Sequence, residues 1–234
     1  MGYSDSTATA GALPQERVAF IKKTYLHVAL ALGLFVLFEH LLWGTVVHRE
    51  MLSFIQSGRY AWLGILGIFM VAGWLARSLA TKMTSQFAQY LGLGIYVLLE
   101  ALIFLPLITL AMHVSSDGLL IKKALVITGT LFTGLSAVVL MTRKDFSFLR
   151  TGLMIGGFVA IGLIAAGAIF GFNLGLVFSG GMILLASAAI LYDTSNVLHH
   201  YQTGMHVGAA LELFASIALL LWYVLSFLIG SSRD

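Results

Sequence analysis

The sequence predicts an all-α membrane protein built as one bundle of seven transmembrane helices. Of its 234 residues, 59% are hydrophobic and only 10% are charged, whereas a soluble domain carries roughly a quarter of charged residues. The apolar residues form continuous windows of the roughly 17 to 25 residues that a helix needs to cross a bilayer. These windows do not alternate between apolar and polar residues, so a transmembrane β-barrel is disfavoured.

Seven windows meet this length, and charged or polar connections separate them. In chain order they are Tyr25–Val47, Tyr60–Ala76, Phe87–Met112, Ala124–Met141, Gly152–Phe170, Leu174–Leu198 and Gly208–Gly230. Little of the chain lies outside them, which leaves no room for a soluble domain. We therefore expect an N-terminal tail over residues 1–24, a membrane domain over residues 25–230 and a C-terminal tail over residues 231–234.

The positive charges predict the orientation of the bundle. The chain has 13 Lys and Arg residues, and more of them fall in the set of alternate connections that includes the N-terminus. That set holds Arg17, Lys22, Lys23, Arg77, Lys82, Arg143, Lys144 and Arg150. Because cytoplasmic connections carry the excess of positive charge, we expect a cytoplasmic N-terminus and a C-terminus on the opposite side. This bias accounts for the net charge of +3 without a nucleic-acid partner.

Glycine spacing suggests where helices approach one another. Gly152 with Gly156, and Gly167 with Gly171, are four residues apart, the spacing that lets two helix backbones come close. Ordinary membrane-helix composition explains either pair equally well.

Ionisable side chains inside the predicted helices mark the candidate functional site. A charge at membrane depth is costly unless it is paired, protonated or hydrated, so such residues are functional candidates. Asp193 is the strongest one, because Thr194, Ser195 and Asn196 extend it into a polar patch. The others are Glu39, His40, Glu100 and Glu212.

The predicted topology places Asp193 and Glu212 at similar depth near the cytoplasmic side. Arg77, which follows the second span, lies on that side and is the nearest counter-charge. Two carboxylates in a low dielectric cannot both be ionised cheaply, so the pair can share a proton near neutral pH. We expect a pH-sensitive latch in which Arg77 pairs with Asp193 in one state and the carboxylates pair in another. The alternative is that both carboxylates are solvated at the headgroup level.

Two further groups leave alternatives open. Glu100 precedes Pro106 by six residues, and because proline lacks an N–H and frees a carbonyl, the two can line a cavity. Alternatively, Glu100 is protonated and bonded to a neighbouring helix. His199, His200 and His206 have spacing that could suit a metal, but no carboxylate framework fixes their geometry, so a solvated loop is favoured.

Several classes of protein are disfavoured by missing residues. There are no cysteines, which removes thiolate chemistry and cysteine metal sites. The seventh window has no lysine for a retinal Schiff base, and no His-Glu-x-x-His or glycine-rich phosphate loop occurs. We expect neither an enzyme nor a resident cofactor. A small-molecule transporter is weaker than the readings below, because no paired broken helices or inverted repeat are visible.

Two segments resemble hallmark segments of the Bax inhibitor-1 family of seven-helix membrane proteins. They are Thr142–Leu149 (Thr-Arg-Lys-Asp-Phe-Ser-Phe-Leu) and Ile190–Asn196 (Ile-Leu-Tyr-Asp-Thr-Ser-Asn). Glu100 followed by Pro106 is also similar to that family's third helix. The resemblance extends over essentially the whole chain in helix number, order and loop length. It implies a fold in which six helices surround a hydrophobic seventh.

The resemblance implies two rival activities. In one branch of the family, an aspartate pair on the sixth and seventh helices senses pH and gates a calcium leak, latched by an arginine. Asp193 and Arg77 match the first aspartate and the arginine, but Ser216 stands where the second aspartate is expected. A serine holds neither charge nor an exchangeable carboxyl proton. Glu212 lies one turn earlier on the same helical face and could substitute, with Ca²⁺ held or conducted at Asp193 and Glu212.

Ser216 and the two segments are more similar to the bacterial branch typified by the modulator of the FtsH protease. This resemblance implies a regulator in the bacterial inner membrane that binds an ATP-dependent protease and restrains degradation of membrane proteins under stress. The polar tail Met1–Glu16 is what such a protease could grip. In this interpretation Asp193 still belongs to a proton-responsive site. The alternative function is a pH-gated cation leak channel. The sequence does not predict the oligomeric state.

Overall fold

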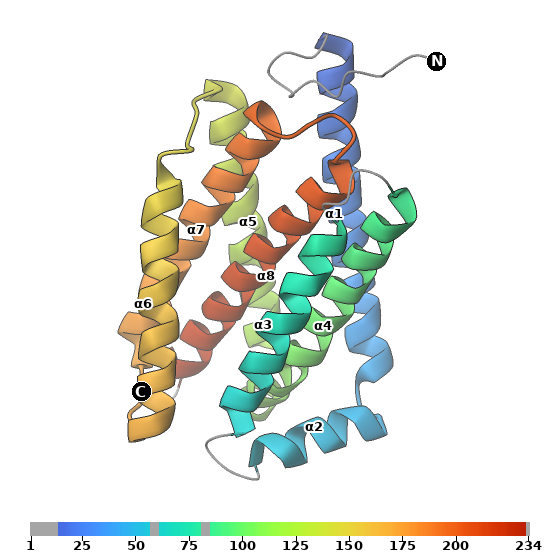
Figure 1. Cartoon of the computed structure of the whole chain (residues 1–234). Coiled ribbons are helices and arrows are strands. Elements are labelled where there is room, and N and C mark those ends of the chain that lie inside the picture. Colours follow the sequence, from blue (N-terminus) through green and yellow to red (C-terminus); the bar gives the residue numbers. More distant parts are fainter. Residues whose placement is uncertain (1–13, 57–60, 81–84, 233–234) are drawn as a thin grey trace.

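The computed structural model describes residues 14–56, 61–80 and 85–232, which form eight helices and the connections between them (Figure 1). In chain order they are α1 (Pro14–Leu42), α2 (Val46–Gln56), α3 (Ala61–Ala80), α4 (Gln86–Val114), α5 (Leu119–Thr142), α6 (Leu149–Phe170), α7 (Gly175–His199) and α8 (His206–Ser231). Six of them, α1 and α4 to α8, are long and apolar enough to cross a membrane. The predicted all-α membrane fold is confirmed.

The seventh crossing depends on α3. This helix replaces the predicted span Tyr60–Ala76, of which Tyr60 lies outside the described residues. It is not among the six helices that qualify as spans, yet it packs along α4 and runs antiparallel to it through the bundle. The beginning of α1 and the end of α8 lie at opposite ends of the bundle in Figure 1. Seven crossings therefore stay a prediction, with α3 as the second of them.

The first helix differs from its predicted span Tyr25–Val47. Helix α1 begins at Pro14, whose fixed φ suits a first helical turn, and ends at Leu42. Just beyond that end, Gly44 adopts a φ of 73°, a left-handed conformation that ends helices and that glycine tolerates best. Residues 14–24, predicted as tail, are thus helical, and residues 1–13 lie outside the described part of the chain.

Helix α2 was not predicted, because a search for spanning windows overlooks short amphipathic helices. It has 11 residues, too few to cross a bilayer, and it lies across the end of the bundle in Figure 1. The His48 ring attaches it: Nδ1 accepts from the Gly44 N–H at 3.0 Å, and Nε2 lies 2.7 Å from Thr109 Oγ1 on α4. Short amphipathic helices of this kind lie in the membrane interface.

Helix α8 forms the centre of the bundle, as the resemblance implies for the seventh long helix. It packs against α1, α3, α4, α5 and α7, and buried residues occur all round it. A helix that is apolar on every face belongs in the interior. Helix α6 is the opposite case, since it packs mainly on α7 and most of its side chains are exposed.

One close helix approach falls at a glycine that the spacing did not indicate. A Cβ on Gly92 of α4 would lie 2.5 Å from the Ala76 carbonyl oxygen of α3, so these two backbones are nearly in contact. Of the predicted positions, Gly156 lies against the Leu185 side chain of α7 and Gly167 lies close to the Phe172 carbonyl oxygen, whereas Gly152 has nothing within 4 Å. Gly171 ends α6 with a φ of 78°. The spacing therefore marks a close contact of α6 with α7 at Gly156, but at none of these positions does a backbone atom come as close as at Gly92.

Candidate functional site

Three consecutive residues near the end of α7 bind three different parts of the protein. Asp193 Oδ2 accepts a hydrogen bond from Ser216 Oγ of α8 at 2.5 Å. Thr194 Oγ1 lies 3.3 Å from Ser136 Oγ of α5, and Ser195 is bonded to the connection between α5 and α6. Since successive residues of an α-helix point about 100° apart, one short polar run can hold three neighbours together.

The connection between α5 and α6 is fixed to α7 by this run. Ser195, which is fully buried, accepts from the Phe146 N–H at 2.8 Å and donates to Asp145 Oδ1 at 3.3 Å. The second carboxyl oxygen of Asp145 lies 3.1 Å from His200 Nε2. The Ser147 N–H donates to Asp145 Oδ1 and, with a smaller effect of His200, lowers the pKa of that carboxyl below its ordinary value. Segment 143–148, which we call the α5–α6 loop, is therefore a well-bonded turn.

The Asp193 side chain lies at the contact between α7 and α8. It is partly buried, and its bonding partner Ser216 is only 7% exposed. A hydrogen bond from a hydroxyl to a carboxylate is charge-assisted and roughly twice as strong as a neutral one. Ser216, where the resemblance led us to expect a second aspartate, thus supplies a hydrogen-bond donor to Asp193.

Arg77 and Glu212 form an ion pair at the same end of the bundle. The Arg77 Nε lies 3.5 Å from Glu212 Oε2, with the two side chains 46% and 27% exposed. The guanidinium carbon also lies 5.5 Å from the centre of the Tyr96 ring, within the range of a cation–π contact. In this structure Arg77 is paired with Glu212 while Asp193 is bonded to Ser216, an arrangement that the expected latch did not include.

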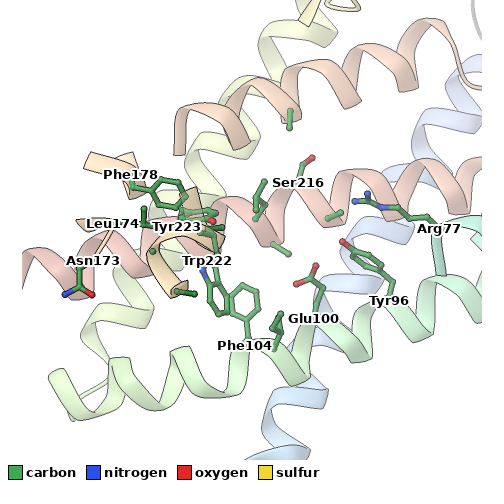
Figure 2. A pocket seen from close by; sticks show the side chains of 18 of the residues that line it. Arg77, Tyr96, Glu100, Phe104, Asn173, Leu174, Phe178, Ser216, Trp222 and Tyr223 are labelled. Carbon is green, nitrogen blue, oxygen red and sulfur yellow. The ribbon is translucent and has the colours of Figure 1, made fainter. Parts of the chain in front are cut away.

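Glu100 is brought next to Tyr96, which sequence reasoning did not single out. Both lie on α4, one turn apart, and both are buried, at 7% and 5% exposed. The Tyr96 hydroxyl is hydrogen-bonded to the Glu100 carboxyl group, as the close approach of the two side chains in Figure 2 illustrates. The signal in the sequence was the four-residue spacing, which puts the two side chains on one helical face.

Arg77, Glu100 and Ser216 share a cavity of about 710 Å³ (Figure 2). Helices α4, α6, α7 and α8 supply most of its wall. Its polar end is formed by these three residues and Tyr96. The rest is largely apolar and aromatic, with Phe104, Phe172, Phe178, Trp222 and Tyr223 among the lining residues. A volume in the range of roughly 300–1,000 Å³ is typical of sites for small molecules.

The remaining candidates are not brought into this site. His199 contacts the Arg143 carbonyl, His200 contacts Asp145, and the ring of His206 packs on His27. Glu39 is buried, and neither of its carboxyl oxygens has a hydrogen-bond partner within the described ranges.

Within the described part of the chain, no three His, Asp or Glu side chains gather as a metal site would require. A Ca²⁺ ion at Asp193 and Glu212 therefore stays a prediction.

Comparison with known proteins places this geometry in a family. A family model described as "Inhibitor of apoptosis-promoting Bax1" matches residues 17–234. The "Modulator of FtsH protease YccA" of Escherichia coli is 40% identical over 50% of this chain and 53% of its own length. An uncharacterized protein of Pseudomonas aeruginosa is 36% identical over 48% of this chain and 50% of its own. "Protein lifeguard 4" of Mus musculus is 26% identical over 97% and 91%, respectively.

The chain spans about half the length of the two bacterial relatives it matches, whereas the family model covers nearly all of it. The central α8 agrees with the fold that the resemblance implied, and six of the seven expected spans are long and apolar enough to cross a membrane. The chain is therefore a multi-pass membrane protein that belongs to the Bax inhibitor-1 family.

Proposed function

We propose that this protein regulates a membrane-bound, ATP-dependent protease of the FtsH type in the bacterial inner membrane, and that Asp193 makes the regulation respond to protons. The family and the name of the Escherichia coli relative support a regulatory role. The described residues form a membrane bundle without a soluble domain, so regulation acts through contact between membrane proteins and their surface loops. Neither a resident cofactor nor a catalytic group is part of the proposal.

The proposed proton response is supported by the hydrogen bonds of three consecutive residues, Asp193, Thr194 and Ser195, at the end of α7. Asp193 holds α8 through Ser216, and Ser195, two residues later, holds the α5–α6 loop. Protonation of Asp193 removes the charge that strengthens its bond to Ser216. The end of α7 then loosens from α8, and because Ser195 lies on the same turn, the α5–α6 loop moves with it. Protonation of Asp193 inside the bundle thereby moves a loop at its surface, where a protease can bind.

The test is degradation of a membrane substrate by the FtsH-type protease of the same bacterium, reconstituted in liposomes with this protein. We expect the wild-type protein to slow degradation, with an effect that changes between mildly acidic and neutral pH. Asp193→Asn resembles the protonated carboxyl group and should keep one level of inhibition at all pH values. Ser195→Ala should weaken inhibition because it frees the loop.

Ser187→Ala is the matched control, since Ser187 lies on the same helix but outside the run Asp193–Ser195. It should inhibit like the wild type. No association with the protease and no effect on degradation would refute the regulatory role, whereas inhibition that is unchanged in Asp193→Asn would remove only the proton response.

A pH-gated cation leak is the second candidate, and the cavity beside Asp193 favours it. Glu100 and Ser216 line that cavity, and Glu212 lies next to Arg77 at the same end. Against it, Ser216 cannot share a proton with Asp193 as a second carboxyl group would. Calcium-loaded liposomes distinguish the two functions. We expect no flux from the wild type and a pH-dependent flux from Ser216→Asp; flux from the wild type that disappears in Asp193→Asn would favour the channel instead.

A further inference from the structure

We propose that the cavity bordered by α4, α6, α7 and α8 binds an amphipathic organic amine, with the ammonium group at Glu100 and the apolar body against the aromatic wall. This small-molecule site does not depend on the proposed protease contact. The distribution of polar and apolar groups along the cavity and the charge at its polar end support it.

The charged residues of the cavity lie at one end, and most of the remaining wall is aromatic or aliphatic. In Figure 2 Arg77 and Tyr96 lie at one end, Glu100 and Ser216 follow, and Phe178 and the amide of Asn173 lie toward the other end. Two aromatic pairs build the apolar part: the rings of Phe104 and Trp222 are 5.2 Å apart, and those of Phe178 and Tyr223 are 5.8 Å apart. An occupant that fits this wall must itself have a polar head and an apolar body.

The charge at the polar end selects a cation. Arg77, the cation at this end, is paired with Glu212 at 3.5 Å. Glu100 brings a second carboxyl group to the cavity, which can pair with an entering cation and repels an entering anion. Glu100 is the acid that lines the cavity, and a carboxylate that accepts from Tyr96 keeps capacity for further donors. An ammonium group supplies such donors, and the aromatic rings beyond it favour cations as well.

The wall formed by α6 suits an occupant that arrives from the bilayer. Helix α6 contributes Ile164, Gly167 and Ala168 to the cavity and packs mainly on α7, with only a light contact to α3. A wall held mainly along one side can separate from α3 at little packing cost. Amphipathic amines concentrate in membranes by burying their apolar chains, so they meet this wall from the lipid side.

Binding can be measured with the tryptophan that lines the cavity. The chain has four tryptophans, and a variant that retains only Trp222 reports on this site. The probes are dodecylamine and dodecanoic acid, which have the same chain length and opposite charge, added to the protein in lipid nanodiscs. We expect a saturable change in Trp222 fluorescence with dodecylamine and none with dodecanoic acid. Equal responses to both would show partition into lipid and overturn the proposal.

Two substitutions locate the amine. Glu100→Gln removes the charge and should weaken dodecylamine binding about tenfold, the loss expected for one charge-assisted contact. Ala168→Phe fills the cavity and should abolish the saturable response, whereas Leu163→Phe on the exposed face of α6 should leave it unchanged. If Glu100→Gln fails to fold, the Ala168→Phe and Leu163→Phe variants still test whether the amine binds in this cavity. A response that survives Ala168→Phe, or that Glu100→Gln leaves at full strength in folded protein, rejects the site.

Discussion

At the scale of single residues, Ser216 decides how Asp193 behaves. A second carboxyl group at that position could hold a proton between two acids, whereas a hydroxyl can only donate one hydrogen bond to a single carboxylate. Ser216 Oγ, at 2.5 Å, gives the Asp193 carboxyl group a hydrogen-bond donor from α8 that carries no charge. Arg77 is then available to Glu212, at 3.5 Å. With serine at position 216, Asp193 is therefore bonded to a hydroxyl group and Arg77 to Glu212.

Ser216→Ala should destabilise the protein by about 1.5–3 kcal/mol, the usual value of a hydrogen bond to a charged group. The loss arises because Asp193 keeps its charge in a partly buried position without its donor. Unfolding in detergent by a chemical denaturant measures the effect, and Ser187→Ala on α7 is the control. Equal stability of Ser216→Ala and the wild type would mean that water replaces the hydroxyl at no cost.

Asp145→Asn should lower stability at neutral pH, and the deficit should disappear in acid. The folded protein lowers the pKa of Asp145 below its ordinary value of 3.8 through the Ser147 N–H. The charged form therefore stabilises the fold above that value, and this contribution is lost as pH falls through the lowered folded pKa. The side chain is 46% exposed, so solvent screening limits the effect to less than about 1 kcal/mol.

Thermal unfolding of wild type and Asp145→Asn across acidic and neutral pH measures this difference. Glu50→Gln removes the same charge from an exposed position on α2 and should show no such convergence. A deficit for Asp145→Asn that grows below pH 4 would contradict the assignment.

The sequence indicated the acids but not their partners. Asp193, Glu100 and Glu212 were identified because a carboxyl group within an apolar run is costly. Which group offsets that cost depends on how far apart the helices lie and how they are rotated, and a linear pattern holds neither quantity. Tyr96 was overlooked for this reason, and Ser195 was named only as part of the polar patch around Asp193, since hydroxyl residues are common in membrane helices and only contacts distinguish them.

At the scale of helices, Gly92 sets the distance between α3 and α4. A methyl group there would meet the Ala76 carbonyl at 2.5 Å and the Ala80 nitrogen at 2.6 Å, both backbone atoms that cannot rotate away. Arg77 follows Ala76 directly, so this contact also positions the guanidinium over Tyr96. The distance between two helices and the geometry of the polar site are therefore fixed together.

Gly92→Ala should destabilise the protein by about 1–3 kcal/mol, the usual cost of overpacking, and should weaken the Arg77–Glu212 pair. Gly94→Ala is the matched control, because that position on α4 has nothing within 4 Å. Chemical unfolding measures stability, and a cross-link between cysteines introduced at Arg77 and Glu212 measures their separation. Equal behaviour of the two alanine variants would show that α3 lies too far from α4 for Gly92 to limit their distance.

Helix α2 packs on α3 and α4, and His48 supplies its hydrogen bond to α4. His48 is 6% exposed and joins the Gly44 N–H to Thr109. Because Nδ1 accepts a hydrogen bond, the neutral ring carries its proton on Nε2 and donates it to Thr109. Amphipathic patterning could have revealed α2, but its attachment depends on a chain reversal at Gly44 that hydropathy does not register.

His48→Ala should release α2 without unfolding the bundle. The variant loses the two hydrogen bonds of the His48 ring, and the remaining contacts of this short helix with α3 and α4 are few compared with those among the long helices. Hydrogen exchange in nanodiscs should show faster exchange of residues 46–56 only. His40→Ala is the control, since His40 is exposed near the end of α1; it should exchange like the wild type. Faster exchange throughout would instead give His48 a role in the stability of the whole bundle.

At the scale of the whole molecule, hydropathy predicted the architecture because lipid restricts a spanning chain to helices and barrels. It could not predict which helix lies at the centre. Helices α6 and α8 are similarly apolar, yet α6 lies at the edge and α8 is surrounded. The difference between the two helices lies in how many of their side chains pack against neighbouring helices. The positions of the charged residues predict the remaining global property, which is the direction in which the chain crosses the membrane.

That direction predicts which loops face the cytoplasm. If the N-terminus is cytoplasmic and α3 crosses the membrane, the α5–α6 loop faces the cytoplasm and the connection between α4 and α5 faces outward. The chain has no cysteines, so single cysteines can be introduced without background labelling. Lys144→Cys and Ser116→Cys place them at exposed positions in these two connections. In intact cells, with the outer membrane made permeable, an impermeant maleimide should label Ser116→Cys and should reach Lys144→Cys only after lysis. The reverse pattern would place the α5–α6 loop outside and remove it from the reach of any cytoplasmic protease, because a contact surface must lie on the side where its partner works.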